Sequence, residues 1–367
     1  MKEYYVPKTG LIFFDIARAY GLGIVGYAIA DEPDVIVEDS GIAYKVTVKG
    51  DVDVENTEQI QSYLFSDDTP YSQYWKHILK TSNVKNKLKE ETIGFFKSPK
   101  NVEKLLEKHS KLSTFDTWIF ESEKRKTTEK QSKKLQIPQS LELGAGKGIR
   151  SIVPSTLTEK GLELPGEHRD QLYLAILGAL NASVYSFQKS GSTTYTYIVY
   201  PVPGRVEIEY IVTRAITTEL REALTKSHRA GLLPTLAYIA VEIEIARKTS
   251  FLEEQTLIPS LAYGVMARSP QAKDKPYATG KFPMNLVSKI PSEILFFWRN
   301  ILRNTRKKKG YEDIAIALSK FIAEPTLENY YSYIKLHLRN ELKSDSIKFG
   351  FYEKNSLLEV LKNVETC

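Results

Sequence analysis

Cysteine is almost absent from the sequence, because Cys367, the last residue, is the only one. One thiol cannot form a disulfide within the chain, and a zinc site built on cysteine needs two to four thiolates. The 5 histidines lie far apart, and none belongs to an H-x-x-H or H-x-x-x-H pair. The sequence therefore carries no metal signature, and we expect the protein to use no metal or other cofactor.

Catalytic motifs are also lacking. The chain contains no H-E-x-x-H, no G-x-S-x-G and no D-x-D pair with a histidine close by. Two pairs of acids, Asp51 with Asp53 and Asp67 with Asp68, fall in predicted turns, where aspartate commonly forms local hydrogen bonds. We therefore expect a protein that is not an enzyme.

A large excess of either charge is missing too, since 51 basic residues face 45 acidic ones and leave a net charge of +6. Such a balance permits a polyanionic partner, but local clustering of charge decides whether one binds. The 42% of hydrophobic residues allow a sizeable core. The 3 methionines and 1 cysteine, beside many lysines and glutamates, are typical of heat-adapted proteins.

The longest apolar stretch, 11–30, has the length of a membrane span. It contains Asp15 and Arg18, three positions apart, as well as three glycines. Two opposite charges one helical turn apart can pair inside a protein, whereas a lone anchor would carry them at a cost in lipid. We interpret the stretch as a buried helix and expect a soluble, cytoplasmic protein with no membrane partner.

Hydrophobic periodicity predicts an α+β fold in two parts. Residues 1–285 are expected to form a mixed domain of short antiparallel hairpins and helices, and 286–367 a small C-terminal helical bundle. The two hairpins turn at 39–41 and 202–204. Long basic or glycine-rich loops are expected over 123–168 and 268–283. Helices are predicted over 9–30 (with Thr9 as N-cap), 56–112 with interruptions, 169–189, 214–228, 233–248, 292–306, 312–323, 326–342 and 353–364, and strands over 35–38, 42–49, 115–120, 195–201, 205–213 and 257–267.

The glycine-rich run 143–151 is the most suggestive motif. Glycine lets the backbone approach a ligand closely and turn its N–H groups toward an anion, and two cations stand among the glycines. The residues concerned are Gly144, Gly146, Lys147, Gly148 and Arg150.

This run matches neither common nucleotide motif. A P-loop needs glycine at position 141, which is leucine, and serine or threonine at 148. A dinucleotide-binding loop needs glycine where Ile149 stands. We favour phosphate or nucleic-acid contact, and a flexible connector and a nucleotide site remain as alternatives.

A second basic group lies on the predicted helix 292–306 and just beyond it. At helical spacing four cations, Arg299, Arg303, Arg306 and Lys307, fall on one arc, while Trp298 and other apolar residues cover the opposite side. No acid occurs between 299 and 309. The helix is predicted to pack one face and offer the other to phosphates, with an ordinary solvated face as the alternative.

The predicted loop 268–283 carries four cations, Arg268, Lys273, Lys275 and Lys281, against one acid, Asp274. Tyr277 is available there to stack on a base or to act as a wedge. The cluster at 124–134 is interrupted by acids and is more typical of a solvated face. The tyrosine-rich stretch 329–339 has the spacing of a helix, which favours a core role over a stacking platform.

Three segments resemble the large subunit of the archaeal type I-A CRISPR surveillance complex (Cascade). They are 9–23 with its following hairpin, the Gly-Ala-Gly-Lys-Gly-Ile-Arg-Ser loop, and 321–331. The resemblance implies a non-enzymatic subunit of a ribonucleoprotein that reads the protospacer-adjacent motif on duplex DNA in antiviral defence. It would also assist unwinding and assembly and recruit the helicase and nuclease.

The resemblance further implies partners and site residues. The partners would be guide RNA (crRNA), target double-stranded DNA, the Cascade backbone subunits, a separate small subunit, and the helicase and nuclease. In related large subunits a glycine-rich loop and a lysine approach the motif through the minor groove, and Gly144, Gly146, Lys147 and Gly148 match that description. A nucleotide-binding enzyme that uses 143–151 and a purely structural guide-RNA-binding subunit remain as alternative functions.

Overall fold

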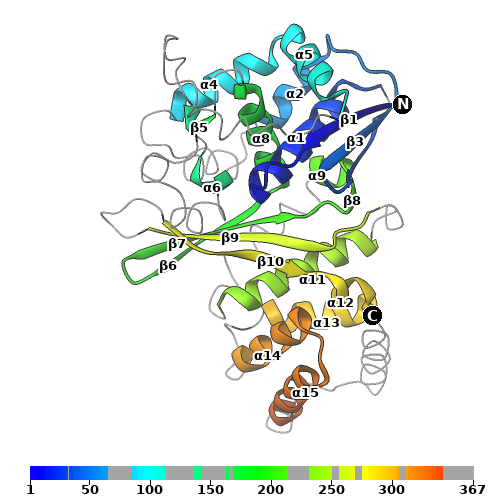
Figure 1. Ribbon diagram of the computed structural model, residues 1–367. Helices are drawn as coiled ribbons and strands as arrows, with labels where there is room; N and C mark the ends of the chain where they lie inside the picture. The colour runs from blue at the N-terminus through cyan, green and yellow to red at the C-terminus, as the bar shows by residue number, and fades with distance from the viewer. Residues whose placement is uncertain are drawn as a thin grey trace.

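The computed structural model describes the chain over several ranges, on which all statements below rest. They are 1–31, 33–64, 85–112, 135–136, 138–142, 163–164, 168–213, 231–249, 256–268, 275–303, 305 and 311–341. Within them the protein has an α+β fold, in which two four-stranded antiparallel sheets are combined with helices (Figure 1). The expected fold class is confirmed.

The first sheet belongs to the N-terminal half and has the strand order β1-β3-β2-β8. Its strands are β1 (Lys2–Pro7), β2 (Asp34–Asp39), β3 (Ala43–Lys49) and β8 (Arg205–Glu207). The β2–β3 hairpin turns at Ser40 and Gly41, where Gly41 has a φ of 86°. This hairpin confirms the one expected at 39–41, whereas β1 has no counterpart among the strands predicted from the sequence.

Helix α1 (Ile12–Ile29) covers one face of the first sheet. Valines 35, 37, 46 and 48 are buried against it because strand residues two apart share a face. A further group of helices completes the N-terminal half, and α2, α6 and α8 among them contact α1. They are α2 (Thr57–Leu64), α4 (Lys85–Phe96), α5 (Pro99–His109), α6 (Gln139–Glu142), α8 (Arg169–Ala182) and α9 (Glu209–Val212), beside a small ladder of β4 (Leu135–Gln136) and β5 (Glu163–Leu164).

Helices α1 and α8 pack backbone against backbone. A Cβ atom built on Gly178 would lie 1.8 Å from the carbonyl oxygen of Ala17 and 2.6 Å from the backbone nitrogen of Gly21. A Cβ atom on Gly21 would lie 2.0 Å from the carbonyl oxygen of Leu174. Only glycine fits at these two positions, since any side chain would force the helices apart.

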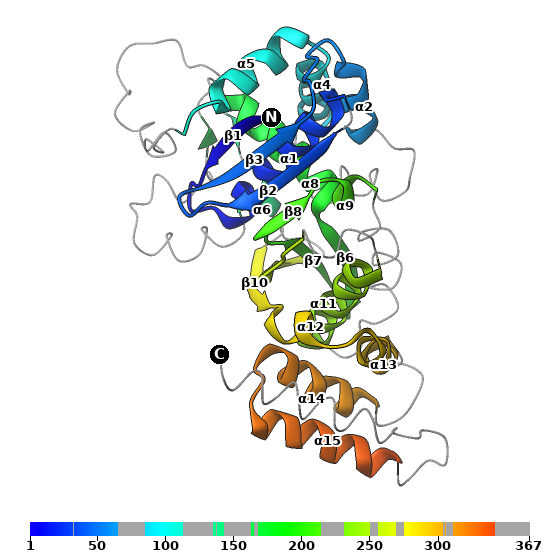
Figure 2. The same cartoon turned by 90° about the vertical axis from the view of Figure 1, so that its right-hand side faces the viewer.

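The second sheet has the order β10-β9-β7-β6 and lies between the N-terminal half and the C-terminal helices (Figures 1 and 2). Its strands are β6 (Val184–Ser190), β7 (Thr193–Pro201), β9 (Ser260–Arg268) and β10 (Lys275–Pro283). Strand β6 directly follows α8, so the α1–α8 contact also sets where the second sheet begins. In Figure 1 the β6–β7 hairpin projects away from helix α11 (Leu232–Thr249).

Of the C-terminal helices, the first three pack against α11 and the last packs against the third. They are α12 (Asn285–Lys289), α13 (Ser292–Arg303), α14 (Tyr311–Ala323) and α15 (Leu327–Glu341). Tyr330 and Tyr333 are buried, and both rings contact Phe321. The expectation of a core role for the tyrosine-rich stretch is confirmed for Tyr330 and Tyr333, whereas Tyr331 is exposed. A domain boundary at 285 stays a prediction, although α11 lies before it and packs against α13 and α14.

Helix α1 has the length and composition of a membrane span, but 89% of it is buried inside the protein. Its two charges form an ion pair, with 2.7 Å between Arg18 Nη2 and Asp15 Oδ1. The interpretation of 11–30 as a buried helix is confirmed. Thr9 is not its N-cap, because the helix starts at Ile12 and Thr9 instead donates its hydroxyl hydrogen to Asp15.

Four expectations for the middle of the chain are wrong. The strand predicted over 205–213 ends at Glu207, and 209–212 form helix α9. The helix predicted over 169–189 ends at Ala182, where the Asn181 and Ser183 side chains donate to carbonyls one turn back, and β6 follows. The hairpin across 202–204 does not form, because β7 and β8 belong to different sheets. The segment 268–283 is not all loop, because 275–283 form β10 and pair with β9.

The Gly178–Ala17 contact gives a direct test of the fold. We expect Gly178→Ala to lower the free energy of unfolding by about 3 kcal/mol or more, because the new methyl group meets backbone that cannot move aside. Gly94→Ala is the matched control, since Gly94 is also helical but nothing lies within 4 Å of its Cβ position. That substitution should stabilise by about 0.5–1 kcal/mol. Denaturant unfolding measures the free energy of unfolding of both variants. The same change in both would contradict the close packing of α1 on α8.

Candidate nucleic-acid interface

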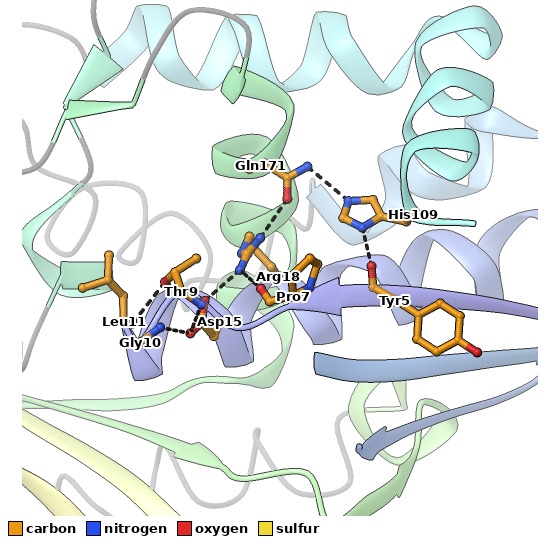
Figure 3. A network of polar contacts seen from close by, with 9 residues as sticks. All are labelled: Tyr5, Pro7, Thr9, Gly10, Leu11, Asp15, Arg18, His109 and Gln171. Atoms are coloured by element: carbon orange, nitrogen blue, oxygen red, sulfur yellow. Dashed lines mark hydrogen bonds and ion pairs between the residues drawn. The ribbon is translucent and has the colours of Figure 1, made fainter. Parts of the chain in front are cut away.

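A buried polar network fixes the start of α1 (Figure 3). The Asp15 carboxylate accepts the backbone N–H groups of Thr9 and Gly10, at 2.8 and 3.0 Å, in addition to the Arg18 guanidinium. Arg18 also donates to the carbonyl of Pro7 and to Gln171 on α8, at 2.6 and 3.0 Å. Asp15, Arg18 and Gln171 are at most 3% exposed. The network therefore joins β1, α1 and α8 and is closed to a ligand.

The same network continues to His109 at the end of α5. Its Nδ1 donates to the carbonyl of Tyr5 at 2.7 Å, and its Nε2 accepts from Gln171 at 3.1 Å. Burial lowers the pKa of His109 to about 4, and the hydrogen bond to the Tyr5 carbonyl opposes this only in part. His109 is therefore neutral at pH 7. Among the described residues no group of three or more histidine, cysteine, aspartate or glutamate side chains could hold a metal ion.

The second sheet differs from the first in its charge. None of the 45 acidic residues of the chain lies in β6, β7, β9 or β10. These strands carry four cations, Lys189, Arg268, Lys275 and Lys281. In the first sheet, by contrast, cations have acidic partners on neighbouring strands, such as Lys45 with Glu38 and Lys49 with Asp34. The strands of the second sheet therefore contribute positive charge and no negative charge of their own.

The strand register places the cations of the second sheet. Arg268 ends β9 opposite Thr194, and Lys275 begins β10 opposite Ala267. Lys281 lies further along β10, opposite Ala262. The Arg268 and Lys281 side chains are exposed, and neither forms an ion pair with another residue of the described ranges. Exposed cations of this kind gain by neutralising phosphates and releasing the counterions bound to them.

Four tyrosines lie on one face of this sheet, which we call the tyrosine face: Tyr195, Tyr197, Tyr263 and Tyr277. The Tyr195 and Tyr277 rings meet edge to face, with 5.5 Å between centroids and 76° between planes. Tyr277 is 66% exposed. Burial, followed by the nearby Tyr195 and Tyr277 hydroxyls, raises the pKa of Tyr197. The sequence analysis singled out only Tyr277 of these four. The other three join it through strand pairing and register, which the sequence alone does not give.

The predicted cationic arc on α13 is only partly free. Trp298 and the apolar residues beside it are buried, as expected. Arg299, however, lies 4.0 Å from the Glu242 carboxylate on α11, and its guanidinium stacks on Phe296 at 4.8 Å. Arg303 is exposed. The positive charge of Arg299 is therefore partly neutralised, because an acid on another helix lies beside it.

Glu242 also accepts a hydrogen bond from the Tyr238 hydroxyl at 2.6 Å. Burial, and then this hydrogen bond to the carboxylate, raise the pKa of Tyr238, while the positive charges of Arg303 and Arg299 oppose the increase. Both arginines therefore lie near one carboxylate and one phenol. This leaves the second sheet as the stronger candidate interface among the described elements.

Several predicted site residues lie outside the described residues. They are Gly144, Gly146, Lys147, Gly148, Arg150, Lys273, Arg306 and Lys307, together with the predicted elements 115–120, 123–134, 214–228 and 353–364. The expected long loop over 123–168 does include described structure, namely β4, α6 and β5. The roles of the glycine-rich run stay predictions.

The described residues define an α+β protein with one acid-free antiparallel sheet that presents tyrosines and cations. No family model matches the chain. A protein from Archaeoglobus fulgidus, described as "Uncharacterized protein", is 32% identical to the chain over 373 aligned residues. The alignment covers 99% of each of the two proteins. The chain belongs to the same protein family as this archaeal relative.

The buried His109 makes stability depend on pH. Its pKa of about 4 in the folded protein lies below the ordinary value of 6.5, so the unfolded chain binds more protons between these values. We expect the free energy of unfolding to fall as the pH drops from 6.5 toward 4, by about 3 kcal/mol from this residue. Denaturant unfolding of the protein and of His109→Gln at several pH values measures the effect. The same slope in both proteins would exclude His109 as its source.

Proposed function

We propose that the protein is the large subunit of a type I-A CRISPR Cascade complex and binds nucleic acid without catalysing a reaction of its own. The observation that carries the nucleic-acid part is the second sheet, with its exposed Arg268, Lys281 and Tyr277 and no acidic residue in any strand. The assignment to this complex rests on the resemblance of the sequence to that family. The protein would act in the cytoplasm of an archaeal, heat-adapted cell.

The physical requirements of this function suit the chain. In such complexes the guide RNA supplies sequence specificity by base pairing, so the protein has to read only a short motif. A reader of the narrow minor groove needs slender backbone and a long cation, which Gly146, Lys147 and Gly148 offer. Cations such as Arg268 and Lys281 would then add affinity through the phosphate backbone without selecting a sequence.

The proposed partners follow from this role. The subunit would contact guide RNA and target double-stranded DNA, together with the backbone subunits, a separate small subunit, the helicase and the nuclease. Reconstitution with the other type I-A subunits and guide RNA tests the assignment. Failure of the chain to join the complex would overturn it.

The cations of the second sheet give a first test of nucleic-acid binding. Replacing Arg268 and Lys281 together by alanine should weaken duplex DNA binding evenly across sequences and reduce the slope of log affinity against log salt by up to about two. Lys49→Ala is the matched control, because Lys49 is an exposed strand lysine already paired with Asp34. Fluorescence anisotropy titrations at several salt concentrations measure both slopes. Equal slopes for the double variant and the wild-type protein would show that Arg268 and Lys281 do not contact the DNA backbone.

The glycine-rich run gives a second test, which separates motif reading from general phosphate binding. Lys147→Ala in the reconstituted complex should weaken binding to duplexes that contain the protospacer-adjacent motif, while guide-RNA complex assembly stays intact. Gel-shift titrations on duplexes with and without the motif measure the difference. Equal loss on both duplexes would make Lys147 a plain phosphate contact.

A further inference from the structure

The four tyrosines of the tyrosine face point to the same side of the second sheet, and none of them is fully buried. Tyr195 and Tyr197 are two positions apart on β7 and so point to the same side, and Tyr263 on β9 joins them because it lies opposite Val199. These three side chains are only half-buried, and Tyr277 is 66% exposed. Tyrosine combines a large apolar ring with a polar hydroxyl, which suits it to surfaces that bind a partner.

Two backbone features hold the rings in this arrangement. The β9–β10 register shifts between Pro276 and Ala278, which makes Tyr277 the extra residue of a bulge. Bulges at sheet edges turn a side chain to a new direction, and here the ring meets Tyr195. Opposite Tyr263 stands Gly280, where a Cβ atom would lie 2.6 Å from the Tyr263 hydroxyl oxygen. The glycine leaves the space that the Tyr263 side chain occupies across β10.

The charge of the sheet limits which partner can use this face. Its strands contain four cations and no acid, and a sheet one residue thick does not screen cations on its far side. By the strand register, Arg268 and Lys281 lie on the opposite face of the same sheet from the tyrosines, because Arg268 pairs with Thr194 and Lys281 with Ala262. Positive potential and exposed flat rings together suit a polyanion that also has flat apolar faces.

We propose that the tyrosine face binds the unpaired bases of single-stranded nucleic acid by stacking, independently of sequence. The inference rests on the proposed function and specifies the form of nucleic acid that this sheet recognises. Bases of a duplex are stacked on one another and hide their faces, whereas unpaired bases leave them free for aromatic side chains. Tyr277 is the ring with the most open surface, and Tyr195 supports it from the side.

The test compares oligonucleotides that have the same phosphates but differ in their bases. The full-length protein is titrated by fluorescence anisotropy with oligodeoxythymidylate of about 16 nucleotides, and with an abasic strand of equal length. We expect the thymidylate to bind about 5- to 150-fold more tightly, the range measured for one base stacked on an aromatic side chain. The abasic strand reports the phosphate contribution alone.

Variants assign the difference to Tyr277. Tyr277→Ala should remove most of the preference for thymidylate and leave abasic binding unchanged, whereas Tyr277→Phe should keep affinity within about twofold, because stacking needs the ring and not the hydroxyl. Tyr331→Ala is the matched control, since Tyr331 is 63% exposed on α15, away from the sheet. Its thymidylate affinity should be unchanged.

Three results would overturn the proposal. They are equal affinity for the thymidylate and abasic strands, a Tyr277→Ala protein that keeps the preference, and a loss in Tyr277→Ala that is as large for duplex DNA as for the single strand. Each of them can occur while the reconstituted complex still binds motif-containing duplex, so the proposed function would stand. Conversely, a chain that stays outside the complex but prefers thymidylate through Tyr277 would overturn the proposed function and keep the stacking face.

Discussion

The contact between Gly21 on α1 and Gly178 on α8 is the constraint on which the other parts of the structure depend. Neither position can accept a Cβ atom, so the two helices approach until their backbones touch. The buried Asp15–Arg18 pair reaches across the same interface to Gln171. Close backbone packing and a buried charge network both lose much of their energy when atoms shift by small distances, so together they hold α8 in one position.

The fixed position of α8 also determines where the second sheet starts, because β6 follows α8 directly along the chain. Further contacts fix the sheet against α1: the Tyr20 hydroxyl donates to the carbonyl of Pro201 at 2.9 Å, and the Phe13 and Tyr200 rings meet edge to face. One end of the sheet is thus anchored in the core, while the β6–β7 hairpin projects from it (Figure 1). A rigid anchor with an exposed end suits a surface that has to present rings and cations in a fixed arrangement.

The two sheets use charge in opposite ways. Three cations of the first sheet, Lys45, Lys49 and Arg205, lie beside acids on neighbouring strands, which reduces the positive potential outside that sheet. The second sheet has cations without such partners in its strands. The α13 helix is intermediate, because Glu242 on α11 lies close to Arg299. Among the basic residues that the structure describes, Arg268 and Lys281 are therefore the better candidates for phosphate binding than Arg299.

The sequence by itself determined the α+β class, the buried nature of 11–30, the β2–β3 hairpin and the core role of Tyr330 and Tyr333, since each follows from local periodicity or turn chemistry. The sequence also shows that the segments of the second sheet's strands contain no acidic residue, but only their pairing shows that the four segments form one sheet. Only the tertiary structure decided that 184–190 is a strand, that β7 and β8 belong to different sheets, and that Arg299 meets Glu242. Each of these depends on a contact between residues far apart in the chain, and propensity within a short window carries no information about such partners.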